Sequence, residues 1–311
     1  MKKISLFLLP VFTALLSPGP VWAAPKKIKI VTTTTTFASI AKEIAGEDAE
    51  IYSIASPHRD IHFISPTPKD VMKLKKADFF IHGGLDLEAW RGPLLDAVGR
   101  TELMVPSGER QIDVSKGIPL LEIPTSLSRA EGDIHAFGNP HYWTDPENAK
   151  IIADNIAEGF ARAYPDDAEF FRKNSGAFKQ KIDEKMKDWA NRMGPYQGTP
   201  VITYHKNWSY FAQRFGLVVL EQLEPKPGIP PTAKHVAELI KLMKEKKVKV
   251  IIKETYQESR TPNRIAETTG AAVLTLAQTV GELKEATDYA SMIDYNISLL
   301  EKALSKKVGA L

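Results

Sequence analysis

The chain contains no cysteine among its 311 residues. This absence excludes a disulfide framework, a thiolate metal site, a cysteine nucleophile and a lipid-modified N-terminal cysteine. Any bound metal ion must therefore be held by histidine, aspartate or glutamate. The sequence also lacks an excess of one charge, with 41 basic and 38 acidic residues. We therefore expect no nucleic-acid partner and no binding to an anionic membrane surface.

Long apolar runs are also missing, apart from one at the N-terminus. Lys2 and Lys3 precede the apolar run in residues 5–16, and Val21 and Ala23 place small residues at two cleavage subsites. This run is shorter than the ~20 residues that span a bilayer. We therefore interpret residues 1–23 as a secretory signal peptide. The mature chain is expected to be a monomer that is exported to the periplasm and has no membrane-spanning segment.

Strand-like and helix-like segments alternate along the rest of the chain, which predicts α/β architecture with parallel sheets covered by helices. The strand-like segments are residues 27–34, 50–55, 78–81, 102–105, 200–204, 217–221, 248–253 and 272–276. The helix-like segments are residues 37–45, 67–76, 87–98, 146–163, 165–193, 208–215, 232–246, 261–268 and 286–304. The five threonines at 32–36 are interpreted as a strand end and a helix cap. Residues 111–138 lose this periodicity, which predicts a long loop.

The chain is about twice the usual domain length of ~150 residues, which favours two lobes. We interpret residues 24–164 as an N-terminal α/β lobe, 165–193 as a connecting helix and 194–311 as a C-terminal α/β lobe. The connecting helix would be roughly 40 Å long at ~1.5 Å per residue, enough to run along a whole lobe. As the only strong link, a stiff helix predicts small tilts of one lobe rather than a large hinge closure.

Polar side chains with metal-binding chemistry follow several of the predicted strands. His62 lies in the loop after the second strand, His205 directly follows residues 200–204, and His141 precedes the helix at 146–163. A lone loop histidine is usually a solvated residue, but ligands of open parallel sheets bind outside the carboxyl ends of the strands. Three imidazoles and one oxygen would complete the tetrahedron that zinc prefers. Glu254 follows residues 248–253 and would supply that oxygen, unless it is an ordinary salt-bridge residue.

Three motifs carry a resemblance to a known family. They are Asp60-x-His62-x-x-x-Pro66-Thr67-Pro68, Asn139-Pro140-His141-Tyr142-Trp143-x-Asp145-Pro146 and Tyr204-His205. In order and spacing they resemble the zinc/manganese class (cluster A-I) of periplasmic solute-binding proteins that serve metal ABC transporters. The resemblance covers essentially the whole mature chain. It implies two pseudo-symmetric α/β lobes, one rigid connecting helix, and one metal ion in the interlobe cleft on His62, His141 and His205. It also implies a membrane permease as partner.

The sequence departs from the family pattern in two places. The usual fourth ligand is an Asp in an Asp-x-x-Gly stretch, and here the matching residues are Gln278-Thr279-Val280-Gly281. An amide oxygen binds a dication more weakly than a carboxylate, so Glu254, Gln278 or a water could be the fourth ligand. We favour Glu254, because an anionic oxygen lowers the cost of burying a 2+ charge. Zinc members often carry a histidine-rich segment before the second histidine; this loop has only His135, which predicts little additional metal capture.

These observations predict high-affinity capture of Zn²⁺ and its delivery to an ABC-type importer. Mn²⁺ suits the site less well, because this hard cation favours more oxygen ligands. Because ligating imidazoles must be neutral, the affinity is expected to fall as the pH drops below roughly 6.5.

Two other classes of protein fit part of the pattern. An exported zinc hydrolase would use the same three histidines, with Glu254 as general base. However, the sequence has no His-Glu-x-x-His segment, no Gly-x-Ser-x-Gly elbow and no phosphate-binding glycine loop, so we expect no enzymatic activity. A purely adhesive or structural protein would show no metal dependence of its thermal stability.

Overall fold

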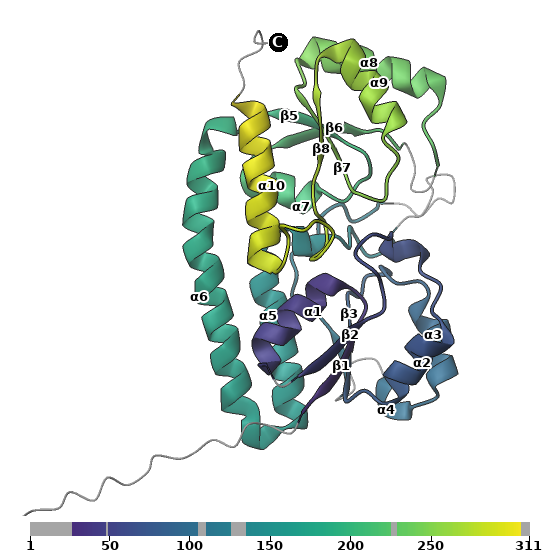
Figure 1. Cartoon of the computed structure of the whole chain (residues 1–311), viewed down its shortest axis with the longest axis vertical. Helices are drawn as coiled ribbons and strands as arrows, with labels where there is room; N and C mark the ends of the chain where they lie inside the picture. The colour runs from purple at the N-terminus through teal and green to yellow at the C-terminus, as the bar shows by residue number, and fades with distance from the viewer. Residues whose placement is uncertain (1–26, 48, 105–109, 126–134, 225–228, 306–311) are drawn as a thin grey trace, which may run out of the picture.

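The computed structural model describes residues 27–47, 49–104, 110–125, 135–224 and 229–305. Within these ranges the chain forms two four-stranded parallel sheets, one from each half of the sequence. Figure 1 shows the two sheets at opposite ends of the molecule's long axis, with long helices beside them. The predicted α/β class, with two parallel-sheet lobes and a long joining helix, is confirmed. The predicted signal peptide lies outside the described residues.

The N-terminal sheet has the strand order β2-β1-β3-β4, and all neighbouring strands are parallel. Thr34 ends the turn after the first strand and caps the next helix, because its hydroxyl accepts a hydrogen bond from the backbone N–H of Phe37. The threonine run is therefore a strand end and a helix cap, as predicted. The elements of this lobe are β1 (Lys29–Thr32), α1 (Thr35–Ala45), β2 (Glu50–Ser53), α2 (Pro68–Lys75), β3 (Phe79–His82), α3 (Arg91–Val98), α4 (Thr101–Met104) and β4 (Gln111–Asp113).

The fourth strand of this sheet is not the one that the sequence predicts. The predicted strand at 102–105 is wrong, because residues 101–104 form the short helix α4. The edge strand is instead β4, which pairs with β3 and lies in the segment predicted as a loop. β4 has only three residues, and a single buried Ile112 between two polar residues gives too short a pattern to distinguish a strand from a loop.

The C-terminal sheet has the strand order β6-β5-β7-β8 and is also fully parallel. This order repeats that of the first sheet, so the two lobes have the same sheet topology, as the family resemblance implies. The elements of this lobe are β5 (Pro200–Thr203), α7 (Ser209–Phe215), β6 (Val218–Gln222), α8 (Ala233–Lys246), β7 (Val250–Lys253), α9 (Arg260–Thr269), β8 (Ala272–Thr275) and α10 (Tyr289–Leu304).

One long helix joins the lobes, and it follows another that packs on α1 and β4 of the N-terminal lobe. α5 (Pro146–Ala163) begins at a proline after the capping residue Asp145, and α6 (Ala168–Met193) follows it. The prediction begins the second helix at Pro165, but Pro165–Asp167 form a separate 3-10 turn. At ~1.5 Å per residue, the 26 residues of α6 span about 39 Å. Figure 1 shows α6 running beside both lobes.

A shared buried core also joins the lobes, so the connecting helix is not their only strong link, contrary to expectation. One continuous cluster of buried apolar side chains includes Phe37 of α1, Trp143 and Tyr289 of α10. The hydroxyl of Tyr289 donates to the carbonyl oxygen of Trp143 at 2.8 Å. The backbone N–H of Val280 donates to the hydroxyl of Thr36 at 3.2 Å. Relative motion of the lobes must therefore deform packed side chains as well as bend a helix.

Among the described residues, no helix combines the length and the apolar content needed to cross a bilayer.

Candidate metal centre

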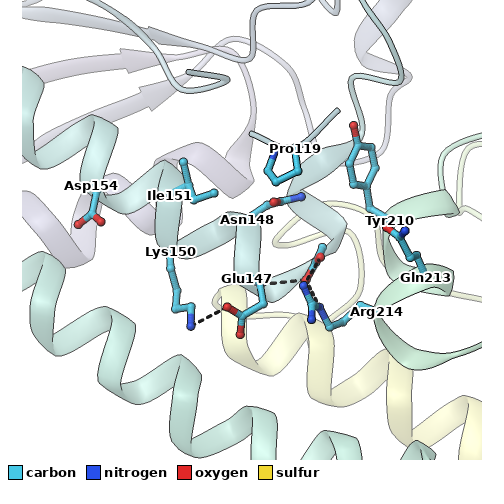
Figure 2. Close-up of a pocket in the computed structure, with 10 residues that line it drawn as sticks. Pro119, Glu147, Asn148, Lys150, Ile151, Asp154, Tyr210, Gln213 and Arg214 are labelled. Carbon is cyan, nitrogen blue, oxygen red and sulfur yellow. Dashed lines mark hydrogen bonds and ion pairs between the residues drawn. The ribbon is translucent and has the colours of Figure 1, made fainter. Parts of the chain in front are cut away.

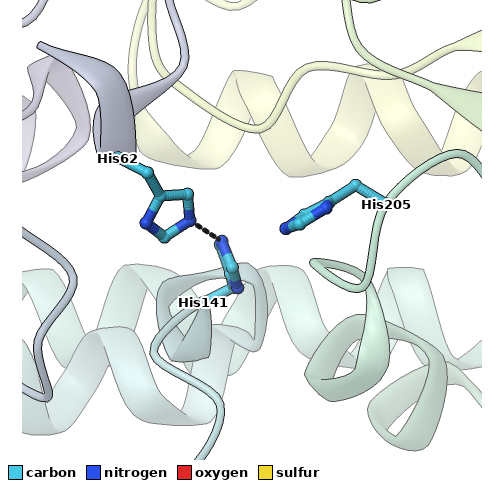
Figure 3. A group of neighbouring side chains, drawn as sticks. All are labelled: His62, His141 and His205. Atoms are coloured by element: carbon cyan, nitrogen blue, oxygen red, sulfur yellow. Dashed lines mark hydrogen bonds between the residues drawn. The ribbon is translucent and has the colours of Figure 1, made fainter. Parts of the chain in front are cut away.

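Three histidines from the two halves of the chain meet between the lobes. One ring nitrogen of each of His62, His141 and His205 lies within 4.8 Å of the others. Figure 3 shows the three rings facing a common centre, with His62 and His141 on one side and His205 on the other. His141 and His205 are 2% and 6% exposed, and His62 is partly buried. The structure thus brings together the three predicted histidines.

His62 is held by a short 3-10 helix, Ile61–Phe63, in the loop after β2. The carboxylate of Asp60 caps this turn by accepting from the backbone N–H of His62 at 2.9 Å. The indole N–H of Trp90 donates to the carbonyl oxygen of Ile61 at 2.8 Å, which ties the loop to the start of α3. The loop therefore fixes the backbone from which the imidazole projects.

His141 precedes a second 3-10 helix, Tyr142–Thr144, which leads into α5. The hydroxyl of Tyr142 donates to the carbonyl oxygen of Gly83, after β3, at 2.6 Å. The indole N–H of Trp143 donates to the carbonyl oxygen of Gln278, in the other lobe, at 2.9 Å. The backbone at His141 is thus fixed to both lobes.

His205 lies two residues after β5, in the C-terminal lobe. The next residues lead to the buried Trp208 and then into α7. The His205 ring is held by Glu224, whose carboxylate accepts from Nδ1 at 2.9 Å. Because β5 and β2 are in different sheets, a cation on all three histidines would be bound by both lobes.

In all three imidazoles the Nδ1 atom faces a hydrogen-bond acceptor. The Nδ1 of His62 is 3.2 Å from the carbonyl oxygen of Leu87, and that of His141 is 2.9 Å from Oδ1 of Asn139. The third acceptor is the Glu224 carboxylate. Because these oxygens can only accept, each Nδ1 carries a proton, and Nε2 is the ring nitrogen left to bind a cation. Such partners fix the tautomer and orientation of metal-binding histidines.

The Nε2 atoms of His62 and His141 lie 3.0 Å apart. Two bare lone pairs at this distance repel each other unless a cation lies between them. Protons are disfavoured there, because burial and the nearby His205 lower the pKa of His62 to about 3. Burial and the neighbouring histidines also lower the pKa of His141 well below its ordinary value. The site therefore presents converging neutral nitrogen donors, which suit a borderline metal cation.

Glu254 and Gln278, the predicted alternatives for a fourth ligand, both lie buried in the C-terminal lobe. The carboxylate of Glu254 is not in the group of donor atoms that lie within 4.8 Å of one another. One of its oxygens accepts from the indole N–H of Trp208, and burial together with Glu282 raises its pKa to about 8. The carbonyl oxygen of the Gln278 side chain accepts from the Tyr256 hydroxyl at 3.4 Å. The identity of the fourth ligand stays a prediction.

A fourth imidazole, which the sequence analysis did not place at the site, lies against the three histidines. The ring of His135 is 4.8 Å from that of His62, centre to centre, with 35° between the ring planes. It is 5.9 Å from the ring of His141. Its position six residues before His141 is the only signal in the sequence. The ring of His135 therefore packs against that of His62.

A separate cavity of about 430 Å³ opens beside α5 and α7. Figure 2 shows two groups of paired charges in its lining, at Lys150 and at Arg214, with Asp154 apart from them. Arg214 donates to both carboxylate oxygens of Asp145, at 2.7 and 2.9 Å, and Lys150 lies 2.7 Å from Glu147. Because these charges neutralise each other and the cavity lining contains no histidine, the cavity is not the metal centre.

The buried imidazoles predict a shallow pH dependence of metal affinity. Three exposed histidines would lower the affinity by up to about 1000-fold per pH unit below roughly 6.5, because three protons would compete with the metal. His62 and His141, with lowered pKa values, stay neutral between pH 6.5 and 5 and do not compete. We therefore expect a Glu254→Gln variant to lose no more than about tenfold per pH unit in that range. Competition titrations at several pH values measure this slope.

The prediction uses the Glu254→Gln variant because the carboxyl group of Glu254 is a second source of protons, besides the imidazoles. Because the raised pKa keeps Glu254 protonated at pH 7, this group must release a proton before it can bind a cation. If wild-type protein loses tenfold more affinity per pH unit than the variant, Glu254 is a ligand. A slope of a hundredfold or more in the variant would contradict the assignment of two neutral, buried imidazoles.

Comparisons with known proteins place the chain in a family. Residues 30–303 match the family model described as "ZnuA: Zinc-uptake complex component A periplasmic". The chain is 29% identical to the iron-binding protein YfeA of Yersinia pestis, over 98% of this chain and 97% of that protein. It is 26% identical to the manganese ABC transporter substrate-binding lipoprotein PsaA of Streptococcus anginosus, over 90% of each. The fold matches a crystal structure of ZnuA with a TM-score of 0.76 at 23% identity, over 90% of this chain and 100% of that one.

Two like α/β lobes, a long joining helix and an imidazole cluster between the lobes define the class of metal-binding proteins that serve ABC transporters. The chain belongs to the ZnuA family. It is thus the periplasmic component of an ABC transporter that binds a divalent metal, in a family of substrate-binding proteins rather than enzymes. The resemblance deduced from the three histidine motifs is confirmed.

Proposed function

We propose that this protein captures Zn²⁺ through His62, His141 and His205 and delivers it to the permease of an ABC importer. One observation carries the proposal: the Nδ1 atoms of all three rings are bound to acceptors, so their Nε2 lone pairs are left for a cation. We also propose that residues 1–23 are an export signal and that the mature protein acts in the periplasm as a monomer.

The donor set favours zinc over the other metals in the names of relatives, which include iron and manganese. Three imidazole nitrogens and at most one carboxylate suit a tetrahedral, borderline ion. Mn²⁺ is lower in the Irving–Williams order and favours more oxygen ligands. We therefore propose Zn²⁺ as the cargo, with Glu254 as the fourth ligand after its carboxylate turns away from Trp208.

Capture and release follow from the placement of the ligands in both lobes. A cation on His62, His141 and His205 adds bonds across the lobe junction, so the loaded form holds the two lobes together more firmly than the shared core alone. The permease would then recognise the surface of the loaded form. Because binding stabilises only the folded protein, zinc at 100 times its dissociation constant should stabilise it by about 2.7 kcal/mol.

Parallel calorimetric titrations of the apo protein with Zn²⁺ and Mn²⁺ test the choice of metal. We expect zinc to bind at least about 100-fold more tightly, because nitrogen donors follow the Irving–Williams order. Tighter binding of manganese would refute zinc as the cargo. The same titration of Glu254→Ala and Gln278→Ala tests the fourth ligand: loss of affinity in the first alone supports Glu254, and in the second alone supports Gln278. If both variants bind as wild type, water is the fourth ligand.

The hydrolase alternative gains no support from the site. A general base must lie within reach of the water that it deprotonates, and the carboxylate of Glu254 is not placed beside the three imidazoles. Its carboxylate also accepts a hydrogen bond from Trp208 and lies outside the group of imidazole donor atoms. We therefore retain transport as the single proposed function.

A further inference from the structure

Asn139 lies at the contact between the two lobes, next to the histidine cluster. It is only 5% exposed. Its backbone N–H donates to the carbonyl oxygen of Leu121 at 2.9 Å, and its own carbonyl oxygen accepts from the hydroxyl of Tyr210, in α7, at 2.8 Å. The Asn139 backbone is therefore held by one segment of each lobe, and its side chain has a fixed starting point.

The two ends of the Asn139 amide have different partners. Its Oδ1 accepts two hydrogen bonds from His141, from the backbone N–H at 3.0 Å and from Nδ1 at 2.9 Å. Its Nδ2 donates to the carbonyl oxygen of Lys206 at 2.9 Å and to Oε2 of Glu122 at 2.8 Å. Donors face one end and acceptors the other, so the partners fix the orientation of the amide. In a flipped amide, Nδ2 would face the two donors of His141, and Oδ1 would face the two acceptor oxygens.

These contacts connect two of the histidines through one side chain. Lys206 directly follows His205, and its carbonyl oxygen is bound by the same amide that holds the ring of His141. The ring of His141 belongs to the N-terminal side of the junction, and Lys206 belongs to the C-terminal lobe. A displacement of either lobe would therefore break one of these hydrogen bonds and move one histidine relative to the other.

Glu122 holds the amide from its outer side. Its Oε1 accepts from the hydroxyl of Ser209 at 3.0 Å, and its Oε2 lies 3.5 Å from Nζ of Lys206. Its backbone φ is 54°, in the left-handed region that residues other than glycine rarely adopt. Such a conformation persists only where surrounding contacts hold it. Here the contacts are with the C-terminal lobe, which supports a role for this segment in joining the lobes.

We propose that Asn139 is a positioning residue that sets the distance and orientation between His141 and His205 across the two lobes. Its Oδ1 keeps the proton of His141 on Nδ1, so that Nε2 faces the metal. Its Nδ2 holds the chain beside His205. This role rests on the proposed function, because it concerns the same three histidines, but it assigns a task to a residue that does not touch the cation.

The test compares Asn139→Ala with Asn155→Ala in the full-length protein. Asn155 is a matched control, because its amide also donates to two carbonyl oxygens, those of Val114 and Lys116, but within one lobe and away from the histidines. We expect Asn139→Ala to weaken zinc binding by about 10- to 100-fold, the usual effect of removing a partner that orients a metal ligand. The zinc affinity of Asn155→Ala should stay within about twofold of the wild-type value, even if its melting temperature falls as much as that of Asn139→Ala.

A spectroscopic measurement separates positioning from general loosening. The ¹⁵N spectrum of the apo protein should show His141 protonated at Nδ1 in wild type and as a mixture of tautomers in Asn139→Ala. Asn139→Asp keeps the acceptor for Nδ1 but loses the donor to Lys206. It should therefore keep the wild-type tautomer and release zinc faster. This second variant keeps the test decisive even where the alanine variant folds poorly.

Three results would overturn the inference. They are wild-type zinc affinity in Asn139→Ala, an equal loss in Asn155→Ala, or an unchanged His141 tautomer in Asn139→Ala. Failure of the proposed function gives a different result, because wild-type protein would then bind no zinc at all.

Discussion

Replacement of His141 by alanine is expected to lower zinc affinity by about 100- to 1000-fold. Binding of zinc at four-ligand sites is worth roughly 10–16 kcal/mol, or about 2.5–4 kcal/mol per ligand, and about 1.4 kcal/mol corresponds to a factor of ten. His141 is 2% exposed and its Nε2 lies 3.0 Å from that of His62. Competition with a zinc chelator of known affinity measures the change.

His235→Ala is the matched control for this prediction. His235 is partly buried, and its ring contacts the carbonyl oxygen of Gln222, at the end of β6, and takes no part in the cluster. Its removal should change zinc affinity by less than about twofold. Zinc binding by His141→Ala at the wild-type level would remove His141 from the site and end the three-histidine proposal.

Replacement of Trp143 by alanine is expected to destabilise the apo protein by about 3–5 kcal/mol, the usual cost of truncating a buried tryptophan. Trp143 is fully buried, packs edge-to-face on Phe37, and donates to the Gln278 carbonyl oxygen. Its loss opens a cavity at the lobe junction beside His141, so we also expect weaker zinc binding. Chemical denaturation gives the free energy of unfolding, and chelator competition gives the affinity.

Trp189→Ala separates these two effects. Trp189 is also fully buried and its indole N–H donates to Asp294 at 3.2 Å, but it lies on α6. Its truncation should destabilise the protein by a similar amount, about 3–5 kcal/mol, and leave zinc affinity unchanged. If both tryptophan variants reduced zinc affinity equally, the lobe junction would have no special role in holding the site.

The sequence was sufficient to predict the two parallel sheets and the meeting of three histidines. The strand-like runs are β-branched and bounded by turn residues, and the carboxyl ends of parallel strands meet at one edge. His62 and His205 follow such strands, so their positions could be inferred without coordinates. The long helix was predicted at 165–193 and found at 168–193, because apolar residues recur along it at helical spacing.

The parts that could not be predicted depend on contacts between distant residues. Glu224 holds the ring of His205 from 19 positions away, and Asn139 binds Lys206 from 67 positions away. Neither pair produces a local pattern. The burial that raises the pKa of Glu254 depends on packing around the C-terminal sheet. The position of Glu254 after a predicted strand therefore does not reveal whether its carboxyl group is protonated. His135 was named but not placed at the site, because a single histidine in a loop is a weak signal.

The most direct test of the account is a zinc-loaded crystal structure with data collected at the zinc absorption edge. The account predicts one strong anomalous peak between the lobes, with Nε2 of His62, His141 and His205 at about 2.0–2.1 Å from it. An anomalous peak elsewhere, with the three rings bound to no metal, would contradict the central claim that both lobes hold one cation through imidazole nitrogens.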